Sequence, residues 1–178
     1  MLMRRRSFLA CFLAAAFVLS LATGPQAQAL GPKGDAFFGY SRTGSDAFYP
    51  GTGGLNGWEG ALHLHLKPLL GVEGDVAHYG LGSDSVVPRT TTYLLGPRVT
   101  VGALGIKLFA HGLIGGEHSS NSYGVSGNAF TYAFGGGVDL PLAPFFRWRF
   151  LVDGINAPDQ SPSEGTHARF TTGLVFHF

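Results

Sequence analysis

Eight segments of alternating apolar and polar residues dominate the sequence after residue 34. Alternation with a period of two is the pattern of β-strands, because successive side chains of a strand point to opposite faces of the sheet. Helical periodicity is poor along the whole chain. We therefore predict eight strands, at Asp35–Gly44, Asn56–Leu66, Leu70–Tyr79, Thr90–Val101, Ile106–Glu117, Phe130–Leu140, Phe145–Gly154 and His167–Phe178.

The connections between these segments alternate in length. Those after the second, fourth and sixth segments are short (KPL, GALG and PLAP). Those after the odd-numbered segments are longer and rich in Gly, Ser, Asn and Asp. Short turns at one end and long loops at the other are typical of an up-and-down antiparallel barrel that crosses an outer membrane. With an even number of strands, both termini should lie at the short-turn end.

The two faces of the predicted strands differ in bulk and charge. One face carries large apolar side chains, such as Trp58 and Phe150, whereas the other mixes Gly, Ala and Thr with charged residues. The interior of an eight-stranded barrel is only wide enough to be filled by side chains, so a ring of aromatic residues does not fit there. An arginine facing lipid costs about 2–4 kcal/mol at the bilayer midplane. Reversing the seventh segment would expose both Arg147 and Arg149.

We therefore expect the bulky face to point outward, towards lipid. The predicted fold is all-β, an eight-stranded antiparallel up-and-down transmembrane β-barrel. Two positions do not follow the pattern cleanly. Phe37 and Phe38 are adjacent, which leaves both orientations of the first strand open. Pro97 lacks the backbone donor that a strand needs in a closed sheet, so we predict a bulge or local distortion there.

The beginning of the chain has the pattern of a cleaved export signal. Three arginines at positions 4–6 precede an apolar run over residues 8–21, and the small-x-small sequence Ala27-Gln28-Ala29 follows. The run is shorter than the ~20 apolar residues that a membrane helix needs. We predict a signal peptide over residues 1–29, cleaved after Ala29, and a barrel domain over residues 30–178. Sec and twin-arginine export both stay open.

Cleavage at this point has consequences for composition. The only cysteine, Cys11, would be removed, so no disulfide or thiol chemistry is expected in the mature chain. Three of the 12 basic residues would also be lost, against 11 acidic residues. The resulting near-neutral charge argues against a nucleic-acid partner.

Charged residues of both signs fall on the inward face. Because buried charges must be paired, we expect a salt-bridge network that plugs the lumen, with an ion path or a catalytic acid–base set as the alternative. Strand number excludes a large aqueous pore, which needs 16–18 strands. The predicted network comprises Glu59, Glu73, Asp75, Arg98, Lys107, Asp139, Arg147, Arg149, Asp153 and Arg169.

Histidines offer little metal-binding pattern in the sequence. His63 and His65 are two residues apart on one predicted strand, so they share a face. Two histidines without a nearby cysteine favour packing in the lumen over metal ligation. We expect neither a metal nor a cofactor.

The last seven residues, TGLVFHF, resemble the C-terminal signal of bacterial outer-membrane barrels. Thr172, Gly173, Phe176 and Phe178 carry its polar-Gly-x-x-aromatic-x-aromatic pattern. Segments such as LLGVEGDVAHYG and AFGGGVDLPL are similar in style to the small eight-stranded OmpA/OmpX-type barrels, the outer membrane protein beta-barrel domain. The resemblance covers Leu30 to Phe178. Nothing follows the barrel in the sequence, so the single-barrel OmpX type is the nearer comparison.

This resemblance implies a place in the cell outer membrane of a Gram-negative envelope. It also implies insertion by the barrel-assembly machinery, contact with outer-membrane lipid and lipopolysaccharide, and a monomeric state. A structural or surface-interaction role is expected. An exported soluble, lipocalin-like barrel that holds an apolar ligand stays open as an alternative; its apolar face would point inward.

A second motif is similar to an enzyme family. His118-Ser119-Ser120-Asn121 resembles the His-x-Ser-Asn motif of the lipid A deacylase barrels, in which a His and a Ser act with a Glu. Here the motif ends the fifth segment instead of lying in the penultimate strand, and residues 130–137 contain no acid. Nucleophilic catalysis needs base and orienting acid within hydrogen-bond reach. We expect no catalysis, with a lipid A-modifying hydrolase using His118 and Ser120 as the alternative.

Overall fold

The computed structural model describes residues 33–45, 47, 53–80, 89–120, 126–156 and 166–178. The predicted signal peptide and its cleavage site at Ala27 and Ala29 lie outside these residues. Parts of the four predicted long loops lie outside them as well. None of the described residues belongs to a helix with the length and apolar character needed to cross a membrane.

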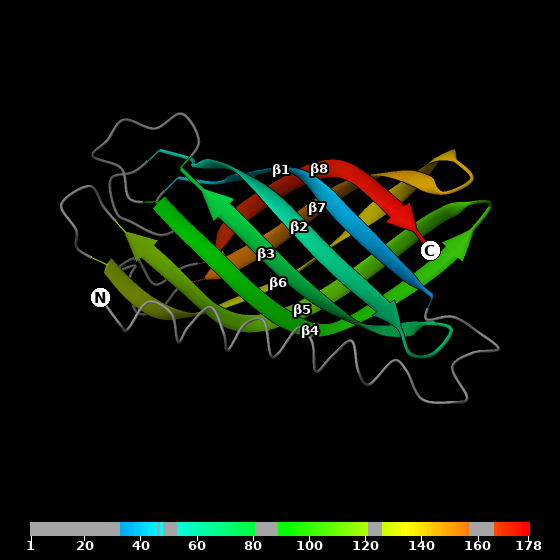
Figure 1. Ribbon diagram of the computed structural model, residues 1–178, viewed down its shortest axis with the longest axis horizontal. Helices are drawn as coiled ribbons and strands as arrows, with labels where there is room; N and C mark the ends of the chain where they lie inside the picture. Colours follow the sequence, from blue (N-terminus) through cyan, green and yellow to red (C-terminus); the bar gives the residue numbers. More distant parts are fainter. Residues whose placement is uncertain (1–32, 46, 48–52, 81–88, 121–125, 157–165) are drawn as a thin grey trace, which may run out of the picture. The chain divides into compact units, whose positions relative to one another are not determined.

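Eight antiparallel strands close into a barrel in which β8 returns to pair with β1 (Figure 1). Each strand otherwise pairs with its neighbours in the sequence, so the predicted up-and-down order is confirmed. The three middle strands are longer than predicted. The bounds are β1 Gly34–Thr43, β2 Asn56–His65, β3 Leu70–Tyr79, β4 Arg89–Ala103, β5 Ile106–Ser120, β6 Ser126–Ala143, β7 Phe146–Asn156 and β8 His167–His177.

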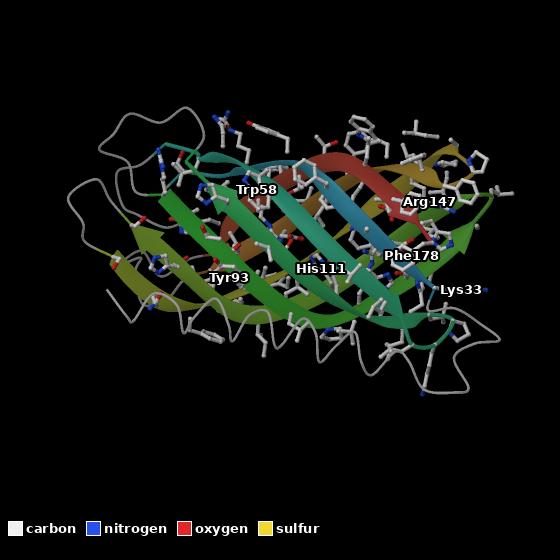
Figure 2. The ribbon with its side chains drawn as sticks, in the orientation of Figure 1. Lys33, Trp58, Tyr93, His111, Arg147 and Phe178 are labelled. Carbon is white, nitrogen blue, oxygen red and sulfur yellow. The ribbon has the colours of Figure 1, made fainter. Side chains whose placement is uncertain are left out.

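Side chains alternate between the interior and the outer surface along every strand. Large apolar residues are exposed, including Trp58 and Tyr93, whereas His111 is buried (Figure 2). Many buried residues are instead Thr, Asp, Glu and Arg. This orientation is the reverse of that expected for a soluble barrel with an apolar interior.

The structure resolves the ambiguity in β1. Phe37 is buried with 4% of its surface exposed, and Phe38 is 66% exposed. Asp35, Ser41 and Thr43 therefore face the interior with Phe37. The alternation pattern of β1 alone does not say which of the adjacent residues Phe37 and Phe38 faces the interior. Pairing with β2 and β8 does, because neighbouring strands must turn their polar faces to the same side.

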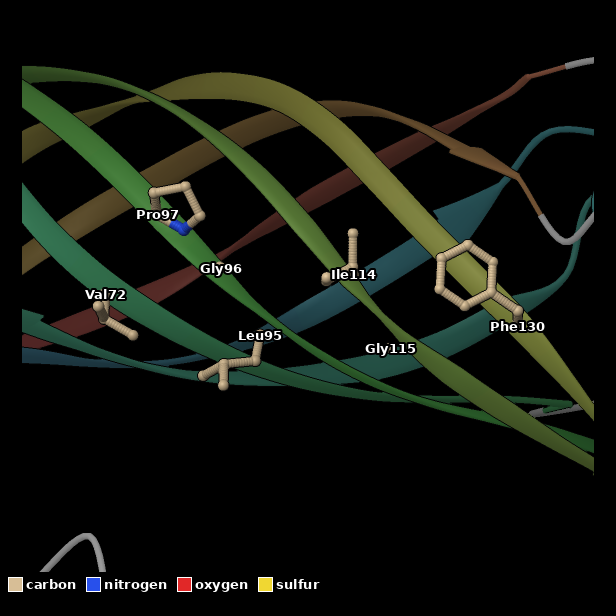
Figure 3. Close-up of a pocket in the computed structure, with 7 residues that line it drawn as sticks. All are labelled: Val72, Leu95, Gly96, Pro97, Ile114, Gly115 and Phe130. Atoms are coloured by element: carbon tan, nitrogen blue, oxygen red, sulfur yellow. The ribbon is translucent and has the colours of Figure 1, made fainter.

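A local distortion occurs at Pro97, as predicted, in the form of a gap and not a bulge. On the β4–β5 ladder, Leu95 pairs with Ile114 and Arg98 pairs with His111, so the register is the same before and after the gap. Gly96 and Pro97 between them have no partner on β5. The gap borders an apolar hollow in the outward surface (Figure 3), which is lined by Val72, Leu95, Gly96, Pro97, Ile114, Gly115 and Phe130.

Two glycines allow the first and last strands to approach closely where the barrel closes. Gly39 of β1 lies opposite Gly173 of β8. A Cβ atom added to Gly173 would lie 2.3 Å from the Gly39 Cα and from the Phe38 carbonyl oxygen. One added to Gly39 would lie 2.4 Å from the Thr172 carbonyl oxygen. Neither position has room for a side chain.

Gly173→Ala is expected to destabilise the folded barrel by about 3 kcal/mol, because the new methyl group overlaps backbone atoms that have no space to move. The free energy of unfolding in detergent measures this loss. Gly112→Ala is the matched control, since a Cβ there meets nothing within 4 Å. Its effect should stay within about 0.5 kcal/mol. Equal stability of the two variants would contradict close approach at the β1–β8 seam.

Candidate functional site

The middle of the barrel interior holds two arginines and two acids in direct contact. Arg149 donates from Nε to Asp139 Oδ1 at 2.7 Å and from Nη2 to Asp139 Oδ2 at 2.9 Å. Arg98 donates to Glu73, and to Asp139 Oδ2 at 3.4 Å. The guanidinium carbons of Arg98 and Arg149 lie 3.7 and 4.5 Å from the centre of the Phe109 ring. Bidentate pairing and contact with an aromatic face both hold a guanidinium in one orientation.

A second group of charged residues lies nearer the loop end, around Arg169. Its Nε donates to Asp153 Oδ2 at 2.9 Å, and its Nη1 donates to Asp75 Oδ1 at 3.1 Å. The same Nη1 lies 3.5 Å from Glu59 Oε2. Glu59 also accepts a hydrogen bond from the Thr171 hydroxyl at 2.8 Å. One buried arginine therefore contacts carboxylates from three strands, β2, β3 and β7.

His111 of β5 joins the two groups. Its Nδ1 lies 2.7 Å from Glu73 Oε1, and its Nε2 lies 2.9 Å from Asp153 Oδ1. Both nitrogens face carboxylate oxygens, so the ring is placed to donate from both sides. Sequence reasoning did not include His111 in the charge network. The sequence feature that could have indicated its role is its inward position on the fifth alternating segment.

Most residues of the predicted charge network are brought together by these contacts. Two are not. Lys107 lies at the short-turn end, with its Nζ 3.5 Å from Asp35 Oδ1. Arg147 lies apart, and its Nη1 donates to the Gly105 carbonyl at the β4–β5 turn at 2.6 Å. The residues that join in the network are Glu59, Glu73, Asp75, Arg98, Asp139, Arg149, Asp153 and Arg169.

Charges of both signs lie in the interior, as the sequence predicts, and among the described residues buried carboxylates outnumber buried guanidinium groups. Asp35 and Glu117 are buried but were not counted among the inward charges, and Arg147 does not join the buried network. Among the described residues, the fully buried guanidinium groups are those of Arg98, Arg149 and Arg169. Histidines supply additional donors to the acids.

Three histidines surround Asp35 at the short-turn end. His63 Nδ1 lies 3.3 Å and His65 Nε2 lies 3.6 Å from Asp35 Oδ2. His177 Nδ1 lies 2.7 Å from Asp35 Oδ1, which Lys107 also approaches. The shared face predicted for His63 and His65 is present. Asp35 and His177 were missed, because their proximity depends on how β1 pairs with both neighbours.

The residues of the hydrolase-like motif point to different faces. His118 is exposed, and its Nδ1 lies 2.7 Å from Asn128 Oδ1. Ser119 is buried, with its hydroxyl 3.3 Å from that of Thr90. Ser120 is half-buried, and Asn121 lies outside the described residues. Glu117 is buried on the inward face, opposite to that of His118.

No protein-family model matches the sequence, and no curated protein matches it either. Solved structures do match. The N-terminal β-barrel domain of Pseudomonas aeruginosa OprF is 15% identical, with a TM-score of 0.58 over 82% of this chain and 96% of that one.

Two further matches have the same architecture. Ail, the attachment invasion locus protein of Yersinia pestis, is 18% identical, with a TM-score of 0.54 over 83% and 99% of the two chains. Neisserial surface protein A is 10% identical, with a TM-score of 0.62 over 82% and 96%. The chain therefore has the fold of the small eight-stranded outer-membrane β-barrels.

Arg149→Met is expected to destabilise the barrel by about 3 kcal/mol, because Asp139 loses its bidentate partner while buried. The double variant Arg149→Met/Asp139→Leu should recover most of this loss, since both charges are then removed. Urea unfolding of the folded barrel in detergent micelles measures each value. Arg147→Met is the control and should change stability by about 0.5 kcal/mol or less. A single variant as stable as the parent chain would show that the pair contributes nothing.

Proposed function

We propose that this chain is an integral outer-membrane barrel whose interior is closed by its own side chains. Its role is structural or one of surface interaction, and it does not transport large solutes. The observation that carries the proposal is the orientation of the strands, with apolar side chains outside and a connected charge network inside. Both features suit a barrel surrounded by lipid.

The outer surface supports contact with a bilayer. Exposed Phe, Tyr, Trp, Leu, Ile or Val side chains occur on every strand. Aromatic residues gather near the short-turn end of the last two strands, where Phe146 and Phe176 have ring centres 5.6 Å apart. Outer-membrane barrels carry an apolar band about 25 Å tall, flanked by aromatic girdles. Strands of 10 to 18 residues reach the ~9–11 residues that a tilted membrane strand needs.

The interior supports a closed lumen. The connected network draws side chains from β2 through β8 across the interior. Nearer the loops, a cluster of buried apolar residues adds to it, including Tyr79, Leu94, Leu113 and Ile155. Eight strands leave room for side chains and not for a water-filled channel of porin size.

Export and assembly follow from the proposed location. Residues 1–29 serve as a cleaved signal peptide, and residues 30–178 form the barrel. The assembly machinery recognises the last strand through Thr172, Gly173, Phe176 and Phe178. The folded chain is a monomer in contact with outer-membrane lipid and lipopolysaccharide, with no nucleic-acid partner.

The role we propose lies at the surface and includes no catalysis. His118 pairs with Asn128 on the outward face, while Glu117 lies on the opposite face, so the motif lacks the acid that would orient the histidine. One protein of the same fold, Ail, is named for attachment and invasion. Recognition by the long loops is the corresponding proposal for this chain.

Phe150→Arg is expected to destabilise the membrane-embedded barrel by about 2–4 kcal/mol, because the exposed Phe150 lies midway along β7, where the side chain would face the bilayer core. The readouts are unfolding in lipid vesicles and recovery in the outer-membrane fraction after carbonate washing. Leu104→Arg is the control, since this fully exposed residue lies at the β4–β5 turn, and its cost should be about 0–1 kcal/mol. Release of the parent chain into the soluble fraction would overturn the proposal.

Planar-bilayer recordings of the folded chain should give no steady conductance of porin size. The reason is that Arg98, Arg149 and Arg169 are fully buried and cross-link the strands through the lumen. A porin of 16 or more strands, reconstituted in the same lipid, serves as the positive control. A stable open channel of comparable conductance would contradict the closed lumen.

A further inference from the structure

The strand register alone brings Asp35 and two histidines together. Asp35 of β1 lies directly opposite His63 of β2 on one side and His177 of β8 on the other. His65 follows two residues after His63 and faces the same way. The cluster thus lies where the barrel closes, at the short-turn end, and its geometry depends on the pairing of three adjacent strands.

The distances within this cluster match a metal coordination shell. A zinc ion bound tetrahedrally at about 2.0–2.1 Å holds its ligand atoms about 3.3 Å apart. His63 Nδ1 and His65 Nε2 lie 3.3 and 3.6 Å from Asp35 Oδ2. One ligand atom from each of these three residues lies within 4.8 Å of the other two. Two imidazoles therefore converge on one carboxylate oxygen at nearly the spacing that a shared ion requires.

The surroundings hold these side chains in place. His177 Nδ1 contacts the other oxygen of Asp35 at 2.7 Å, which is the role that outer-shell groups have around metal-bound carboxylates. The His63 and His65 rings are 4.3 Å apart in an edge-to-face arrangement. Gly71 makes room for His63, because a Cβ at Gly71 would lie 2.2 Å from its Nε2. That buried nitrogen has no hydrogen-bond partner, so the ring is held on its polar side through Nδ1, the atom that faces Asp35 Oδ2 at 3.3 Å.

An ion can reach the cluster from the short-turn end. Asp35 and His63 are buried, whereas the side chains of His65 and His177 are 21% and 34% exposed. Three ligands with one open position are typical of zinc sites that keep a water molecule. Imidazole with carboxylate suits zinc, copper or nickel better than calcium or magnesium. Lys107 approaches the far oxygen of Asp35 at 3.5 Å, and its charge opposes a bound cation.

We propose that Asp35, His63 and His65 bind one divalent transition-metal ion of the zinc class, with His177 positioning Asp35. The ion links β1 to β2 beside the β1–β8 seam, so its binding stabilises the closed barrel, because the separated strands of the unfolded chain offer no such site. The sequence favoured lumen packing for His63 and His65, since the third ligand is contributed by a strand that sequence spacing does not connect to them. The inference does not depend on the proposed cellular role.

The test uses the untagged full chain, folded in detergent and stripped of metal with a chelator. Titration with zinc chloride, followed by calorimetry and by the midpoint of thermal unfolding, should give one ion per chain and a higher midpoint. His65→Ala and the more conservative His65→Gln should each weaken zinc binding at least tenfold. His177→Ala should weaken it about 10- to 100-fold, as outer-shell changes do. His118→Ala, at the opposite end of the barrel, should bind as the parent chain does.

Lys107→Met should change the zinc affinity in the opposite direction to the histidine substitutions. Removing this positive charge beside Asp35 should tighten zinc binding several-fold, which a generally loosened barrel end would not do. Unboiled gel mobility shows which variants have folded. The proposal is overturned if the parent chain binds no zinc, if His65→Gln binds as tightly as His118→Ala, or if Lys107→Met weakens binding as His65→Ala does.

Discussion

Closure of β8 against β1 is the constraint on which the rest of the structure depends. It removes the free edges that an open sheet would present, and it fixes an interior just wide enough to be filled by side chains. The pair Gly39 and Gly173 allows the two strands to meet at a distance that no other residue permits. Because the interior is narrow, most of the large apolar residues face outward, and only a minority, such as Phe37, Tyr79 and Phe109, lie inside.

A charged interior follows from that geometry, and its charges need partners within the barrel. Burying an ion is costly unless its partners are close and well oriented. Arg149 meets this requirement through two hydrogen bonds to Asp139, and Arg169 through contacts with acids from three strands. The network restrains the strands relative to one another across the lumen. The apolar outer face and the ion pairing inside are thus two results of the same narrow barrel.

Strands with clean alternation were predictable residue by residue. The faces of β2 and β7 follow directly from the sequence, because three of the five inward positions on each strand hold a charged residue or a histidine. At Pro97 the sequence indicated a disturbance but not its form. The structure shows a gap on the β4–β5 ladder without a change of register, since the missing donor removes a hydrogen bond but adds no residue.

The sequence by itself determined the number of strands, their order and the apolar character of the outer face, because these depend on local alternation and on connection length. Only the tertiary structure decided which charges meet. Lys107 of β5 and Arg147 of β7 occupy inward positions of their strands, yet neither joins the buried network. Asp35 is 142 residues from His177 in the sequence and 2.7 Å from it in the barrel. Contacts of this kind depend on register between strands that are remote in the chain, which no local pattern encodes.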